Sequence, residues 1–134
     1  MTNCEPIQAV YHSQQPLMSV EGYYFEGTLL RAICLVFENR SLFFFAQDDD
    51  SLGVSTSKDA IPDDDLQVHD ITASAHWSLA VGRTMTWVWR LTNQQGYLDG
   101  IQFEFSKDSY NKSWQVQILI VAGAVQAREI RRIL

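Results

Sequence analysis

The fold of this chain is decided by residues 84–105, TMTWVWRLTNQQGYLDGIQFEF. Large apolar side chains recur at every second position of the first half of this stretch, at Met85, Trp87, Trp89 and Leu91. A period of two is typical of a β-strand with one buried face, so we expect Trp87 and Trp89 to lie in the core. Asn and Gly in residues 92–96 favour a turn, and the alternation resumes over residues 97–105. The stretch therefore predicts a β-hairpin.

Two further hairpins are predicted on either side of this one. Residues 29–37 (LLRAICLVF) and 42–46 (LFFFA) are apolar runs joined by a short polar turn, and residues 115–122 precede a closing segment from Val125. The apolar positions of residues 29–37 also match those of residues 97–105, and each run follows an aromatic strand and a glycine. This repeated order indicates two similar β-meanders, arising either by internal duplication or because meanders resemble one another.

The remaining segments connect these meanders. Residues 47–62, rich in Asp, Ser and Gly, predict a surface loop, residues 66–71 a strand, and residues 73–81 the one short helix. Residues 124–134 fit both a helical stripe and an edge strand, and we favour the strand. We therefore predict a single domain over residues 1–134. Its class is mainly β, α+β at the margin, with antiparallel sheets built from two similar β-meander units packed as a sandwich or partly open barrel.

The strands of the first meander are apolar on both parities. In residues 29–37 and 42–46, neither alternate set of side chains is polar, whereas a sheet with one solvated face shows polar residues on that face. These strands are therefore expected to be covered on both faces. Either the short helix and the termini provide the second cover, or a homodimer or another protein does.

Composition and charge exclude several classes of partner. The chain has 134 residues, 46% of them apolar, and a net charge of −6, which opposes binding to phosphate backbones and anionic membranes. We recognise no signal peptide and no membrane-spanning segment. Cys4 and Cys34 are expected to be free thiols in a reducing cytoplasm. The sequence thus predicts a cytoplasmic protein with no nucleic-acid or membrane partner.

Two acidic runs are the candidate binding residues. They comprise Asp48, Asp49, Asp50, Asp63, Asp64 and Asp65. Asp48, Asp50, Gly53 and Asp59 fall on positions of a calcium-loop pattern that other positions of the stretch break. Asp48 and Asp50 together with His69 and Asp70 are weak candidates for a pooled metal site. Solvated acidic loops that keep sheet edges from pairing are the simpler interpretation, and we expect no metal.

Sequence motifs for catalysis are not found. The chain has no GxSxG element, no glycine-rich phosphate loop and no CxxC pair, and His76 precedes a tryptophan that suggests a structural place. We predict no catalytic residue and no cofactor, and leave an unrecognised carboxylate pair as the remaining route to an enzyme. The basic residues are Arg83, Arg90, Arg128, Arg131 and Arg132, among others. They are expected to balance the acidic loops, with a small anionic ligand as the alternative.

Two parts of the chain resemble known families. The first resemblance is carried by Trp77, Gly82, Trp87, Asn93, Gly96, Tyr97 and Asp99. These positions resemble a small bacterial domain family of unknown function and about this length. Residues 27–37 are similar to the β-rich, immunity-type proteins that neutralise bacterial toxins. Neither resemblance implies a catalytic residue.

These observations favour a non-enzymatic protein-interaction module, immunity-like in that its acidic loops mask a basic surface. One alternative is a small metal-dependent enzyme or metal-binding protein that uses the acidic loops. Another is a structural homodimer. The expected partner is a second copy of the chain or another protein.

Overall fold

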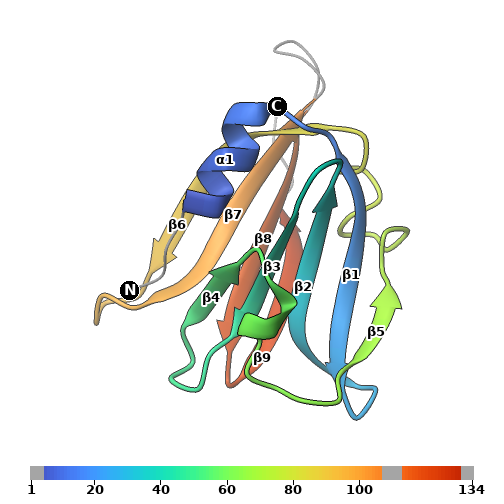
Figure 1. The fold of residues 1–134 in the computed structure, drawn as a ribbon. Coiled ribbons are helices and arrows are strands. Elements are labelled where there is room, and N and C mark those ends of the chain that lie inside the picture. Colours follow the sequence, from blue (N-terminus) through green and yellow to red (C-terminus); the bar gives the residue numbers. More distant parts are fainter. Residues whose placement is uncertain (1–4, 107–112, 131–134) are drawn as a thin grey trace.

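Two antiparallel sheets form the molecule, a computed structural model of which describes residues 5–106 and 113–130 (Figure 1). The elements are α1 (Glu5–Ser13), β1 (Leu17–Phe25), β2 (Leu29–Phe37), β3 (Ser41–Ala46), β4 (Leu52–Ser55), the 3-10 turn η1 (Lys58–Ala60), β5 (Gln67–Asp70), β6 (Thr84–Thr92), β7 (Leu98–Ser106), β8 (Trp114–Val121) and β9 (Ala124–Ile130). The first sheet has the order β4-β3-β2-β1-β5 and the second the order β6-β7-β8-β9. The predicted mainly β class is confirmed.

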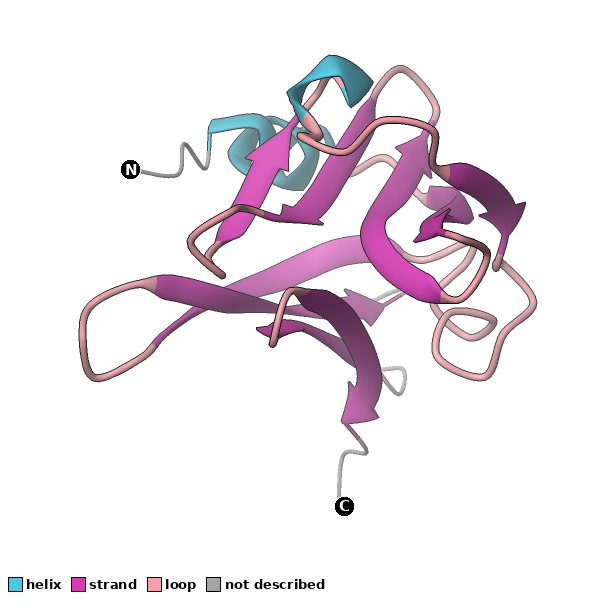
Figure 2. Ribbon diagram, turned by 90° about the horizontal axis from the view of Figure 1, so that it is seen from below, coloured by secondary structure: helices cyan, strands magenta, loops and turns pink. Residues whose placement is uncertain are grey.

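The sheets lie in two layers and do not close into a barrel (Figure 2). Their facing sides supply one large apolar core, in which the rings of Phe44 from β3 and Phe103 from β7 meet edge to face at 5.2 Å. Helix α1 lies beside β6 and adds Ile7 and Val10 to this core. Backbone bonds from Leu17 N to Arg83 O and from Gly82 N to Leu17 O join β1 to the start of β6. The two sheets are therefore linked at the point where the chain enters each of them.

The predicted helix is in the wrong place. Residues 73–81 form a series of turns in which Trp77 is completely buried, whereas the helix of the described chain is α1. Packing of Trp77 into the core overrides the helical pattern, and Pro6 at the start of α1 suits a first helical turn.

The loop predicted over residues 47–62 contains strand β4, whose Leu52 is fully buried. The predicted strands at residues 66–71 and from residue 124 are confirmed as β5 and β9. The closing residues 131–134 lie outside the described chain.

The first sheet is covered on both faces, as its apolar strands predicted. On the outer face, Tyr23, Cys34 and Phe45 belong to a second, smaller core, which is closed by Ile61 and Leu66. These two residues belong to the segment between β4 and β5, which crosses over the outer face of the sheet. Among the described residues, the cover therefore comes from this crossover segment, and not from α1 or from the turns at residues 73–81.

The prediction that Trp87 and Trp89 lie in the core is wrong. In the pairing of β6 with β7, Met85 is opposite Phe105 but Trp87 is opposite Glu104, so Thr86 is an extra residue on β6. Such a bulge moves all later side chains to the opposite face. Met85 and Val88 therefore face the core, while Trp87 and Trp89 point outward with 58% and 41% of their surface exposed.

Candidate functional site

The first acidic run, Asp48 to Asp50, forms the exposed turn between β3 and β4. One carboxylate oxygen of Asp49 accepts hydrogen bonds from the backbone N–H of Ser51 at 3.1 Å and from its hydroxyl at 2.5 Å. These bonds favour the ionised form and lower the pKa of Asp49. Asp49 therefore remains a carboxylate held in a fixed orientation by its own turn.

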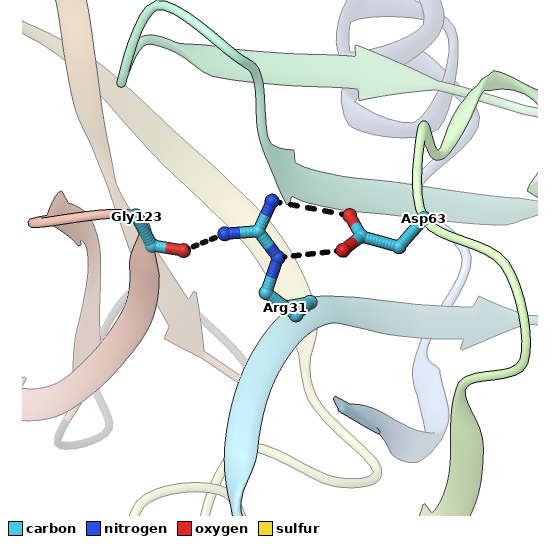
Figure 3. Close-up of polar contacts among 3 residues, drawn as sticks. All are labelled: Arg31, Asp63 and Gly123. Atoms are coloured by element: carbon cyan, nitrogen blue, oxygen red, sulfur yellow. Dashed lines mark hydrogen bonds and ion pairs between the residues drawn. The ribbon is translucent and has the colours of Figure 1, made fainter. Parts of the chain in front are cut away.

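The second acidic run contributes one carboxylate to a partly buried ion pair (Figure 3). The carboxylate of Asp63 accepts two hydrogen bonds from the guanidinium of Arg31, at 3.0 and 3.1 Å. Arg31 is the extra residue of a second bulge, because Tyr23 and Tyr24 of β1 pair with Ala32 and Leu30 of β2. Asp64 and Asp65 of the same run are exposed. Asp63 is thus part of a partly buried ion pair, and the other two carboxylates of the run are exposed.

Arg31 also connects the two sheets. It donates a further hydrogen bond to the carbonyl oxygen of Gly123, in the turn between β8 and β9 (Figure 3). That turn contains Ala122 and Gly123, both with positive φ, as a tight two-residue hairpin turn requires. One side chain of the first sheet therefore holds both the crossover segment and a turn of the second sheet. These contacts of Arg31 therefore stabilise the fold.

The weak metal candidates lie apart in the structure. Asp48 and Asp50 belong to the turn that precedes β4, at one edge of the first sheet, whereas His69 and Asp70 lie on β5, at its other edge. Thr72 donates a hydrogen bond to Asp70 and lowers the pKa of that carboxyl. Within residues 5–106 and 113–130, no three His, Cys, Asp or Glu side chains are close enough to share a metal ion.

His76 has the structural place that its neighbouring tryptophan suggested. Its ring Nδ1 lies 2.5 Å from a carboxylate oxygen of Glu129 on β9, and its carbonyl oxygen accepts a 2.8 Å hydrogen bond from the indole of Trp114. Both contacts hold the turns that precede β6 against β8 and β9. His76 therefore links segments that lie far apart in the sequence.

The outer face of the second sheet combines tryptophan and amide side chains, a composition that the outer face of the first sheet lacks. Its register places side chains in rows across the strands, with Trp87 beside Glu104 and Gln115, and Trp89 beside Gln102 and Gln117. We call these six residues the aromatic–amide face. The two indoles stand on the edge strand β6, and the amides and the carboxylate occupy the two strands next to it.

Hydrogen bonds fix the polar part of this face. Gln117 donates to Gln102 at 3.0 Å, Gln102 donates to Gln115 at 3.1 Å, and Gln115 donates to Glu104 at 3.0 Å. The hydroxyl of Thr86, the bulge residue, donates to the carbonyl oxygen of Glu104 at 3.1 Å. The three amides and the carboxylate hold one another, so this polar part of the face has little rotational freedom to lose when something binds.

A cleft of about 640 Å³ opens where the β3–β4 turn and the β6–β7 turn face each other. The side chains from the first sheet include Phe45, Gln47 and Asp49, and those from the second include Arg90, Thr92 and Tyr97. Arg90 also borders a second, smaller pocket of about 240 Å³ beside α1. The volume of the larger cleft, about 640 Å³, lies in the range of about 300–1,000 Å³ typical of ligand sites.

Sequence reasoning missed both of these features. The glutamines at 102, 115 and 117 were visible as the polar parity of two strands, but they pointed only to a solvated face. The place of the tryptophans depends on one extra residue in β6, which leaves no mark in the alternation of the sequence. The cleft is formed by two turns that lie far apart in the sequence, one in each sheet. No local sequence pattern therefore predicts it.

No helix of the described residues is long and apolar enough to cross a membrane. Searches for similar proteins find no match among the curated proteins or among the solved structures. Residues 2–134, nearly the whole chain, match the family of unknown function DUF6334. The chain therefore belongs to the DUF6334 family.

Proposed function

We propose that this protein is a non-enzymatic protein-interaction module that binds its partner through the aromatic–amide face. The observation that carries the proposal is the exposure of Trp87 and Trp89 side by side on one edge strand. Tryptophan is the residue most enriched at the energetic centres of protein interfaces, where it buries a large rigid surface. An exposed pair of indoles is costly to leave in water, and a partner that covers them gains that free energy.

The neighbouring amides suit a protein partner. Glutamine side chains donate and accept hydrogen bonds, and three of them are held in place beside the indoles. A patch that combines apolar anchors with fixed polar groups is the usual anatomy of a specific interface. The acidic loops are then a steering field for a basic partner, as in an immunity-like protein, and not the contact surface itself.

The alternative of a metal-dependent enzyme has less support, because its four candidate residues lie on opposite edges of one sheet. We propose a cytoplasmic location, and the buried free thiol of Cys34 supports it because thiols persist in a reducing compartment.

The test is partner capture from a lysate of the organism that makes the protein, with the double variant Trp87→Ser/Trp89→Ser beside the unaltered chain. The control is Phe25→Ser/Leu29→Ser, which removes two other exposed apolar side chains, at the turn that joins β1 to β2. We expect the tryptophan variant alone to lose a captured protein. Equal capture by all three chains contradicts the proposal.

Sedimentation equilibrium on the same three proteins decides whether the partner is a second copy. Self-association that only the tryptophan variant abolishes identifies a homodimer through this face. A monomer in all three directs the search to a different protein.

A further inference from the structure

We propose that the cleft between the β3–β4 and β6–β7 turns binds a small zwitterion of about dipeptide size, with its ammonium group at Asp49 and Gln47 and its carboxylate at Arg90. This site is separate from the aromatic–amide face, so the proposal goes beyond the protein-interaction function and does not depend on it. The argument rests on which hydrogen-bonding groups each wall leaves free.

The wall from the first sheet presents hydrogen-bond acceptors. The amide nitrogen of Gln47 donates to the Ser51 hydroxyl at 2.9 Å and to the Leu52 carbonyl at 3.3 Å. The Leu52 carbonyl is an acceptor only, so the nitrogen must lie on that side and the Gln47 oxygen is left for a ligand. Asp49 gives one oxygen to Ser51 and keeps the other. Both free atoms accept, and Asp49 is negatively charged.

The wall from the second sheet presents the opposite polarity. Arg90 is opposite Ile101 in the register, which places it on the side of β6 that faces the first sheet. Its guanidinium has no hydrogen bond or ion pair with any residue of the described chain. A guanidinium only donates and matches the two oxygens of a carboxylate. One sheet therefore contributes a negative group to the lining of the cleft and the other sheet a positive group.

The cleft is also lined by aromatic and apolar side chains. The ring of Phe45 lies over Gly53 so closely that a Cβ at Gly53 would be 2.3 Å from it, and Tyr97 and Leu98 line the other side. Tyr97 is 53% exposed, so a flat apolar group has a surface to cover. One positive and one negative group sum to zero, and this favours a neutral ligand with separated charges over an anion or a cation alone.

The volume sets the size of the ligand. A cleft of about 640 Å³ has the capacity of a site for a drug-sized molecule and exceeds the needs of a single amino acid. A dipeptide with one aromatic side chain supplies an ammonium group, a carboxylate and a ring in one molecule. Its ammonium group has three N–H donors, enough for both acceptors, on Asp49 and on Gln47.

The experiment measures binding of dipeptides that contain Phe, Tyr or Trp to the full chain by ligand-observed NMR, followed by titration. Each dipeptide is compared with its N-acetylated form, which lacks the ammonium group, and its C-terminal amide, which lacks the carboxylate. We expect each blocked form to bind about tenfold or more weakly, since each loses a charge-assisted hydrogen bond. No binding by any member at millimolar concentration overturns the proposal, as does binding that ignores both blocking groups.

Two variants assign the two ends. Arg90→Gln is expected to bind the free dipeptide and its amide equally, and Asp49→Asn to bind the free dipeptide and its acetylated form equally. Arg40→Gln and Asp64→Asn are matched controls on exposed residues outside the cleft and keep the full discrimination. Asparagine at position 49 retains an oxygen for the Ser51 bonds, so the turn is preserved. Discrimination that survives in Arg90→Gln or Asp49→Asn contradicts the assignment.

Discussion

The ion pair of Arg31 with Asp63 gives the sharpest test of the structure. We expect Asp63→Ala to lower the free energy of unfolding, because it leaves the guanidinium with the Gly123 carbonyl alone. The two side chains are 15% and 19% exposed. Exposed pairs contribute below about 1 kcal/mol, and removing one partner of a buried pair costs about 3–5 kcal/mol. Partial exposure places this pair between those limits, at about 2–3 kcal/mol, or roughly 6–12 °C in Tm.

The assay is urea unfolding followed by circular dichroism, with Asp64→Ala as the control. Asp64 is an exposed neighbour with the same charge, so its loss is expected to change stability by less than about 0.5 kcal/mol. The double variant Arg31→Met/Asp63→Ala removes the unpaired charge and is expected to be less destabilised than the sum of the single variants. An Asp63→Ala chain as stable as Asp64→Ala refutes the structural task of this pair.

Three further predictions follow from burial. Trp77→Ala is expected to lower the free energy of unfolding by about 3–5 kcal/mol, because it truncates a large core side chain. Trp87→Ala and Trp89→Ala are each expected to lower it by less than about 1 kcal/mol in the same unfolding assay. Equal losses in the three variants contradict the bulge in β6. Gly53→Ala puts a Cβ 2.3 Å from the Phe45 ring and is expected to cost about 1–3 kcal/mol, part of which Phe45→Leu restores in a double variant; an unchanged Tm argues against this close contact. Burial raises the pKa of Cys34 from 9.0 to about 12 and that of Tyr23 from 10.0 to about 12. Because both groups are protonated more strongly in the folded state, their contribution to stability is fully present below pH 9 and is lost as the pH rises towards 12; unfolding at a series of alkaline pH values measures this loss, and stability that rises over that interval contradicts it.

The strands were predictable where alternation and turn residues agreed. The hairpins around residues 38–40 and 93–97, the strand β5 and the closing strand β9 all appear where local pattern placed them. The two covered faces of the first sheet were also legible, because residues 29–37 are apolar on both parities. The local pattern could not predict which residues cover the outer face. In the sequence, Ile61 and Leu66 look like ordinary loop residues, and only the path of the chain across the sheet brings them to this face.

Bulges limited the prediction of the candidate sites. The alternation of residues 84–91 is unbroken in the sequence, yet the extra residue Thr86 reverses which side chains are buried. The bulge at Arg31 had a visible sign, one charged residue inside an apolar run, but its partner Asp63 lies far along the chain. The acidic runs were therefore found as surface features, while the internal use of one carboxylate was not.

The cover of the first sheet also has a consequence for the order of synthesis. A ribosome releases β1 to β3 first, and the residues that close their outer face follow soon afterwards, directly behind β4. The inner face of the first sheet is not covered by nearby residues. The side chains that cover it, such as Phe103, Ile118 and Val125, come from the last strands to be made. A nascent chain that stops before β7 therefore displays Ile33, Leu35 and Phe44 to its neighbours. Truncated chains of this protein are for that reason expected to need a chaperone.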